Sequence, residues 1–299
     1  MIAIAAVIAA AVAAGLATRR RLGDRADVLS RRILATMLYA LVPPVVFFNL
    51  AHLELTADVG GGIVLAWVTV VAAGLLAHAI ATRTLGLDRP RTGTLINVTL
   101  HPNTGYLGLP VCAAALGTGS LDRAIAYDTL VGSPTLLLGV FAVGAAFGTR
   151  AGETRAARTR AFLARNPPLL AAVAGQLAPA ALAPDVLVDA SRGLVFALLP
   201  LGFFAVGIVL AAEGPLRCPD RTLMTALGLR LIVAPALLLA LAAPLIDLPE
   251  PYLIAAAMPT GVNGLVVAHA YGLDVGLQAA AAVYGTMIVV TVAVVLSLL

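Results

Sequence analysis

The sequence predicts an all-α polytopic membrane protein in which ten transmembrane helices form two inverted repeats of five helices each. Three observations predict this fold. First, 61% of the 299 residues are hydrophobic and 11% are charged, with a mean hydropathy of +1.01. A fold in water cannot bury so much apolar surface, so lipid must surround most of it. Second, the arginines fall in alternate connections between apolar runs. Third, short motifs recur in the second half of the chain.

Ten apolar runs are long enough, or nearly long enough, to cross a bilayer. The runs are 2–17, 33–50, 62–81, 92–116, 121–147, 167–182, 188–211, 222–245, 251–271 and 275–298. Positive charges follow the first run, at Arg19, Arg20 and Arg21. A cleavable signal peptide has its charges before the apolar run, so we expect a retained first helix.

The 19 basic residues are all arginine, and their positions predict the orientation. Sixteen lie in the connections after the first, third, fifth and seventh runs. The remaining connections hold only Arg123 and Arg192, and Arg230 falls inside the eighth run. The positive-inside rule then places both termini outside the cytoplasm, in a multi-pass protein of the cell inner membrane. We expect a first repeat over 1–148, a cytoplasmic arginine-rich loop over 149–166 and a second repeat over 167–299.

Three motifs recur in the same order at a nearly constant spacing. Proline and two phenylalanines in the second run (Pro44, Phe47, Phe48) recur 156 positions later. Pro102 and Pro259 lie 157 positions apart, and Tyr127-Asp-Thr matches Tyr284-Gly-Thr at the same distance. Because each repeat holds an odd number of helices, the second repeat is expected to be inverted in the membrane.

The fourth and ninth runs contain the breaks on which function is expected to depend. The first reads HPNTGYLGLP around Pro102, and the second reads MPTGVNG around Pro259. Proline removes a backbone donor, and glycine and asparagine tolerate irregular backbone. Paired breaks at matching places in two repeats are the best sequence pointer to a transporter's binding site. The alternative is that these residues only kink the helices and cap them.

Each break frees amide groups at the start of a second half-helix, where partial positive charge favours an anion. The asparagine amides can donate to a carboxylate, and the threonine hydroxyls lie beside them. The expected substrate-binding residues at the breaks are Asn103, Thr104, Gly105, Thr260, Gly261 and Asn263.

Four segments resemble the auxin efflux carrier family, which includes plant PIN proteins and bacterial malate and malonate carriers. The segments are LVPPVVFFNL in the second run, NTGYLGLP in the fourth, RLIVAP in the eighth and MPTGVNG in the ninth. The resemblance covers nearly the whole chain. It implies ten spans, a crossing of the two broken helices at the binding site, and elevator-like movement of a transport domain against a scaffold. The long hydrophilic loop of many plant members is absent.

Other polar residues inside the runs keep two interpretations each. Asp128 could bind a coupling proton or sodium ion, or it could lie hydrated near the outer interface with Arg123. Asn49 and Tyr127 could line the site; the alternatives are an interhelical hydrogen bond for Asn49 and an interface anchor for Tyr127. Arg230 could attract an anion or extend to the cytoplasmic face.

The function predicted is secondary transport of small mono- or dicarboxylates, with the lipid bilayer and a homodimer as expected partners. A sodium-coupled symporter of the bile-acid type and a non-transporting membrane sensor are alternatives. We expect no enzyme, since no nucleophile–base pair is apparent at membrane depth. Cys112 and Cys218 lack metal-ligand spacing, so no metal or cofactor is expected, and the net charge of +4 does not indicate nucleic-acid binding.

Overall fold

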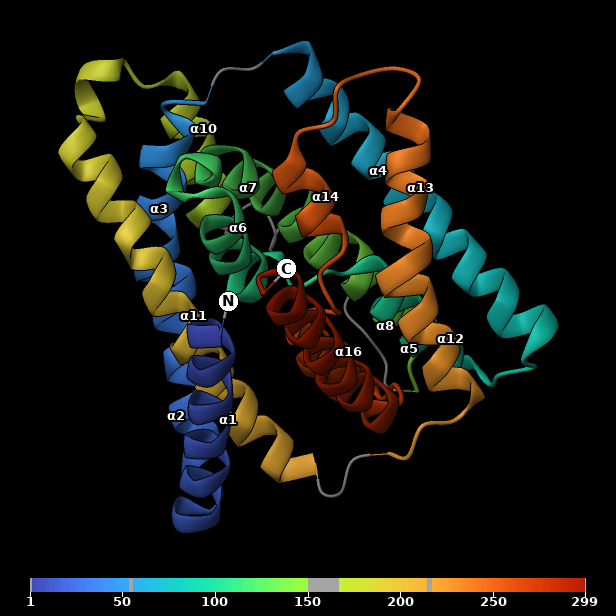
Figure 1. Cartoon of the computed structure of the whole chain (residues 1–299). Coiled ribbons are helices and arrows are strands. Elements are labelled where there is room, and N and C mark those ends of the chain that lie inside the picture. Colours follow the sequence, from blue (N-terminus) through green and yellow to red (C-terminus); the bar gives the residue numbers. More distant parts are fainter. Residues whose placement is uncertain (1, 54–55, 150–166, 214–216, 299) are drawn as a thin grey trace.

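The computed structural model describes residues 2–53, 56–149, 167–213 and 217–298, and these residues form a helical bundle without a named strand (Figure 1). The expected all-α class is therefore confirmed for the described part of the chain. The expected loop over 149–166 lies outside the described residues, apart from Thr149.

Each of the ten apolar runs coincides with helical structure. The α-helices are α1 (Ile2–Leu22), α2 (Arg25–Thr36), α3 (Val42–Leu50), α4 (Ala57–Ala79), α5 (Arg89–Leu100), α6 (Leu109–Leu116), α7 (Leu121–Tyr127), α8 (Phe141–Phe147), α10 (Pro167–Leu177), α11 (Asp185–Glu213), α12 (Arg221–Gly228), α13 (Ala234–Ala242), α14 (Glu250–Ala256), α15 (Asn263–Tyr271) and α16 (Val275–Leu296).

Six continuous helices in the described residues are long and apolar enough to cross a membrane, which makes the chain a multi-pass membrane protein. They are Ile2–Leu22, Arg25–Leu50, Ala57–Thr84, Asp185–Ala212, Arg221–Ala242 and Val275–Leu296. The other four expected spans coincide with helices that are interrupted, widened or short. Two of these, the fourth and ninth runs, are the ones in which the sequence predicts a break.

Prolines widen several helices into π-helical turns. Within the described residues, four such turns end two positions before a proline: η1 (Met37–Leu41), η3 (Thr104–Gly108), η5 (Asp128–Gly132) and η8 (Leu229–Val233). Proline has no N–H, and its ring crowds the carbonyl one turn earlier, so a wider turn relieves the clash without ending the helix. The helix therefore continues past each proline with a local bulge.

The helices form two groups that lie side by side in Figure 1. The first bundle consists of α1, α2, α3, α10 and α11, where α1 packs along α11 and α10 along α3. The second bundle consists of α4 to α8 and α12 to α16, with α5 at its centre between α4, α8 and α16. Both bundles draw helices from both halves of the sequence.

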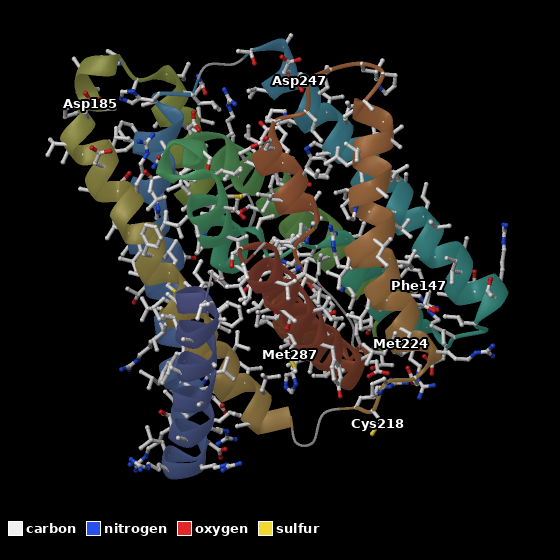
Figure 2. All side chains as sticks on the ribbon, viewed as in Figure 1. Phe147, Asp185, Cys218, Met224, Asp247 and Met287 are labelled. Carbon is white, nitrogen blue, oxygen red and sulfur yellow. The ribbon has the colours of Figure 1, made fainter. Side chains whose placement is uncertain are left out.

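The connections alternate between the two ends of the bundle. The α1–α2 and α11–α12 connections lie at the lower end of Figure 1, and the α10–α11 and α13–α14 connections lie at the upper end. Figure 2 places Asp185 and Asp247 at the upper end and Cys218 at the lower end. The described arginine-rich connections thus share one end, as the alternation in the sequence requires.

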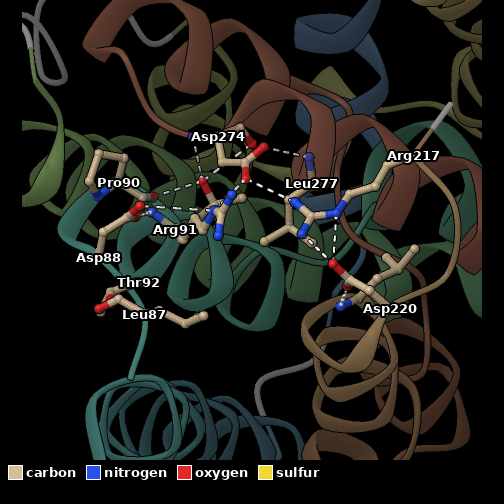
Figure 3. Close-up of polar contacts among 11 residues, drawn as sticks. Leu87, Asp88, Pro90, Arg91, Thr92, Arg217, Asp220, Asp274 and Leu277 are labelled. Atoms are coloured by element: carbon tan, nitrogen blue, oxygen red, sulfur yellow. Dashed lines mark hydrogen bonds and ion pairs between the residues drawn. The ribbon is translucent and has the colours of Figure 1, made fainter. Parts of the chain in front are cut away.

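A network of charged residues holds the lower ends of three helices in the second bundle (Figure 3). Asp88, Asp220 and Asp274 are the N-caps of α5, α12 and α16, and each carboxylate accepts from the backbone N–H three residues on. Arg217 donates to Asp220 and, at 3.0 Å, to Asp274, while Arg91 lies 3.5 Å from Asp274. Burial would raise the pKa of Asp220, but the backbone donors and Arg217 outweigh it and lower that pKa.

Backbone contact between α1 and α11 depends on two glycines. A Cβ atom added to Gly15 would lie 2.9 Å from the Cα atom of Gly207, and one added to Gly207 would collide with the carbonyl of Val12. Small residues let membrane helices approach this closely, and close approach gains dispersion contacts in place of a hydrophobic driving force. These glycines therefore fix the distance between the two helices of the first bundle.

Replacing Gly207 by alanine is expected to destabilise the protein by about 2 kcal/mol, because a methyl group has no room against the α1 backbone. Gly193 lies on the same helix, and a Cβ atom there would have no neighbour within 4 Å. The measurement is thermal unfolding of Gly207→Ala and Gly193→Ala in detergent. Equal melting temperatures for the two variants would contradict the close contact.

Candidate binding site at the crossing of two interrupted helices

The two interrupted helices meet at their breaks. The first ends with α5 at Leu100 and resumes at Thr104, and the second ends with α14 at Ala256 and resumes at Asn263. Between these ends, the unwound segments run antiparallel and form an isolated bridge between Pro102 and Thr260. The breaks predicted from the sequence therefore lie opposite one another.

Two hydrogen bonds close this antiparallel pair. The N–H of Asn103 donates to the carbonyl of Pro259 at 2.7 Å, and the N–H of Gly261 donates to the carbonyl of His101 at 2.7 Å. A Cβ atom on Gly261 would collide with the imidazole ring of His101, so only glycine fits at this position. Each break thus supplies partners for backbone groups that the other break leaves free.

A cavity of about 400 Å³ opens beside the crossing. The N-terminal ends of both resumed half-helices contribute to it, through Thr104 and Gly105 on one side and Asn263 on the other. Most of the other lining side chains are apolar and come from both bundles: Leu34, Val42, Val45, Val46, Leu109, Ile125, Leu136, Phe141, Leu198, Val262 and Val266. Two partial positive helix ends at a largely apolar cavity favour an anionic group there.

The two predicted asparagines both line this cavity. Asn103 is buried, with 4% of its surface exposed, and its Nδ2 atom has no hydrogen-bond partner among the described residues. Asn263 is half-buried and faces the same cavity as Tyr106. Buried amide donors are almost always paired in native proteins, so the free Nδ2 of Asn103 indicates a place for an acceptor from a ligand or water.

Asp128 lies next to the crossing and also lines the cavity. Its carboxylate accepts a hydrogen bond from the Thr104 hydroxyl, and a Cβ atom on Gly105 would lie 3.4 Å from either carboxylate oxygen. Among the described residues, Asp128 forms no ion pair with Arg123, whose side chain is exposed. The Asp128 carboxylate therefore lies beside the breaks, bonded to Thr104.

Three of the predicted site residues do not line the cavity. Asn49 donates to Ser191 at 3.0 Å and accepts from Arg192 at 3.1 Å, so it joins α3 to α11 inside the first bundle. The Tyr127 ring packs against Tyr252, with ring centroids 5.3 Å apart. Asn49 thus makes an interhelical bond, whereas Tyr127 is buried against Tyr252, a position that neither of its two sequence interpretations includes.

The third of these residues is Thr260, whose hydroxyl accepts from Gln278 at 3.2 Å behind the crossing. Pro259 also stays outside the lining, whereas Pro102 and Gly261 contribute to it. The second break therefore presents Gly261 and Asn263 to the cavity and turns Thr260 toward α16.

Arg230 has a position that neither sequence interpretation includes. Its side chain is 3% exposed, does not line the cavity and does not extend to the membrane surface. The guanidinium donates to the carbonyl of Thr99 at 2.7 Å and to the carbonyl of Ala256. It therefore holds the C-terminal ends of α5 and α14 together. The only signal in the sequence is that an arginine within an apolar run requires buried partners.

Two further lining residues are absent from the sequence prediction. Arg31 and Tyr39 lie on the segment from α2 to α3, and both side chains are exposed at the cavity. The sequence places Arg31 among the arginines that set orientation. Its position at the cavity depends on the angle at which α2 meets the second bundle.

Replacing Asn49 by alanine is expected to lower the free energy of unfolding by about 2 kcal/mol, because it leaves Ser191 and the Arg192 guanidinium short of a partner. Thr18→Ala is the control, since Thr18 is half-buried and its hydroxyl donates only to Ala14 of its own helix. The measurement is thermal melting in detergent. If Asn49→Ala and Thr18→Ala have the same melting temperature, the hydrogen bonds between α3 and α11 do not contribute to stability.

Comparisons with known proteins relate the chain to a protein described as a transporter. No protein-family model matches the chain. The chain is 28% identical over 215 residues to a protein of Methanocaldococcus jannaschii that is named an uncharacterized transporter. The similarity covers 69% of this chain and 68% of that protein. The chain is thus similar, over two thirds of its length, to a protein described as a transporter.

Proposed function

We propose that the chain is a secondary transporter of small organic anions, namely mono- or dicarboxylates, which bind at the crossing of the two interrupted helices. One observation carries the proposal: two half-helix N-termini and the unpartnered amide of Asn103 meet in one cavity. This arrangement supplies backbone and side-chain donors to a carboxylate at the crossing.

Three further observations support transport over other membrane functions. The chain has several membrane-spanning helices, a cavity among them, and a relative named a transporter. Unwound backbone at membrane depth is tolerated where it is buried in protein or lines a cavity, and transporters place their substrate at such breaks. The motifs that resemble the auxin efflux carrier family include both breaks, and in that family the crossing is the binding site.

The cavity chemistry narrows the substrate among the carboxylates. Most donors gather at the crossing, whereas Val42, Leu136 and Phe141 give part of the wall an apolar surface, with Arg31, Tyr39 and Ser133 as its polar residues. A second carboxylate placed against such a wall would lose its hydration without a partner. The favoured substrate is therefore an anion with one compact charged end and an apolar body, over a small dicarboxylate.

The two bundles suggest how the site could alternate between the two sides of the membrane. The ten-span, inverted-repeat plan places the first two spans of each repeat in the first bundle, and the last three in the second. Both breaks belong to the second bundle, whereas Val42 and Leu198 of the first bundle cover the cavity from the other side. We therefore assign the first bundle as scaffold and the second as the moving transport domain of an elevator-like cycle.

The predicted orientation assigns a side to the open mouth. Arg31 follows the arginine-rich end of α1 and lies at the cavity. With that end in the cytoplasm and both termini outside, the cavity faces the cytoplasm. The exposed guanidinium of Arg31 attracts anions toward the site. Asp128 is the carboxylate beside the crossing, and we assign it to a coupling proton or, in the bile-acid-type alternative, to sodium.

The test is flux into proteoliposomes with malate, malonate and phenylacetate, each with and without proton and sodium gradients. Asn103→Ala and Asn263→Ala are expected to weaken the apparent affinity for the carboxylate by about tenfold or more, because each removes a hydrogen bond to a charged group. Gln176→Ala removes an amide on α10, away from the cavity, and is the matched control.

If both asparagine variants fold and keep the wild-type affinity, the substrate does not bind at the crossing. Saturable binding of an anion without flux would favour the membrane sensor instead. Flux that requires a sodium gradient would favour the bile-acid-type symporter.

A further inference from the structure

Arg230 is a buried cation beside the crossing that does not line the cavity. It lies in the π-helical turn η8, inside the membrane-spanning helix Arg221–Ala242. Its guanidinium reaches the last turn of α5 at Thr99 and the last residue of α14 at Ala256. The two half-helices therefore end on one guanidinium.

This guanidinium has no carboxylate partner among the described residues. The titratable groups in electrostatic contact with it are His101, from the first break, and Tyr127. A bare charge at membrane depth is costly, so something else must balance it. Each helix C-terminus carries about half a negative charge on carbonyls that lack an intrahelical partner. Two such ends together balance one guanidinium.

The same carbonyls would otherwise be free to bind a cation. In transporters with discontinuous helices, unwound carbonyls and half-helix C-terminal ends coordinate the coupling sodium ion or proton. Here Thr99 and Ala256 are already occupied by a cation that belongs to the chain. A sodium ion at the same carbonyls would face repulsion from the guanidinium at close range.

We propose that Arg230 is a tethered cation that takes the place of a coupling sodium ion at the paired half-helix C-termini, so that anion binding at the crossing needs no sodium. The part concerning anion binding rests on the proposed function. By neutralising the negative ends, the guanidinium leaves the positive N-terminal ends at Thr104 and Asn263 to dominate the field in the cavity. Arg230 is in this sense a positioning residue, since it acts on the substrate through the two breaks.

The first experiment needs no substrate. Arg230→Ala is melted in detergent at constant ionic strength with guanidinium, sodium or choline chloride. Guanidinium and sodium, which can enter the vacated place, are expected to raise its melting temperature by about 3 °C relative to choline, because they bind only the folded state. The wild type and Arg123→Ala, which removes an exposed arginine, are expected to show no such preference.

The second experiment measures binding of radiolabelled phenylacetate and malate. The wild type is expected to bind equally in sodium and in choline. Arg230→Ala is expected to bind about tenfold more weakly in choline, with recovery in guanidinium, because the negative helix ends are left uncompensated. Arg230→Lys keeps the charge and is expected to retain most of the affinity. A purely structural role would weaken binding in Arg230→Ala without recovery by small cations.

Sodium-dependent anion binding in the wild type would overturn the proposal. A melting temperature of Arg230→Ala that is the same in guanidinium, sodium and choline would also overturn it. If Arg230→Ala does not fold, Arg230→Lys decides the question, because lysine keeps the charge. A selective rise of its melting temperature in sodium would show that the carbonyls of Thr99 and Ala256 remain open to a sodium ion beside the tethered charge, and this would overturn the proposal. If the wild type binds neither anion, the proposed substrate class fails for these probes, and the melting experiment still tests the tethered cation.

Discussion

The antiparallel pairing of two unwound segments is the constraint on which the rest of the structure depends. Inside a membrane, a free N–H or C=O costs several kcal/mol, so a helix cannot break where its backbone meets lipid. Here each break supplies the other with partners, through Asn103 with Pro259 and Gly261 with His101. Neither interrupted helix would be stable at this depth alone. The two breaks must therefore lie opposite one another.

That pairing also separates charge. The resumed half-helices begin on the cavity side, at Thr104 and Asn263, whereas α5 and α14 end on Arg230. Positive helix ends thus face the cavity, and negative ends face a buried cation. The polar chemistry of the site comes mainly from backbone, with Asn103 and Asp128 added to it. This charge distribution supports the proposed anion site in a chain whose membrane interior has few charged side chains.

The two bundles differ in how they are held together. In the first bundle, Gly15 and Gly207 bring the backbones of α1 and α11 into contact. In the second, much of the polar bonding lies at the crossing and at the lower ends of α5, α12 and α16, where Arg217 joins Asp220 and Asp274. The cavity lies where the bundles meet, and apolar side chains line its contact with the first bundle. The proposed elevator-like cycle would move this contact without breaking hydrogen bonds between the side chains that line it.

The sequence by itself determined the helical class, because the length and hydropathy of each apolar run are local properties. It also determined the places of the breaks, with an asparagine at each, because proline and glycine act on the local backbone. Only the tertiary structure decided the surroundings of Asn49, Asp128 and Arg230. Asn49 meets Arg192, Asp128 meets Thr104, and Arg230 meets the carbonyls of Thr99 and Ala256, which neither of its sequence interpretations includes. Helix rotation and crossing set those neighbours, and no local pattern records them.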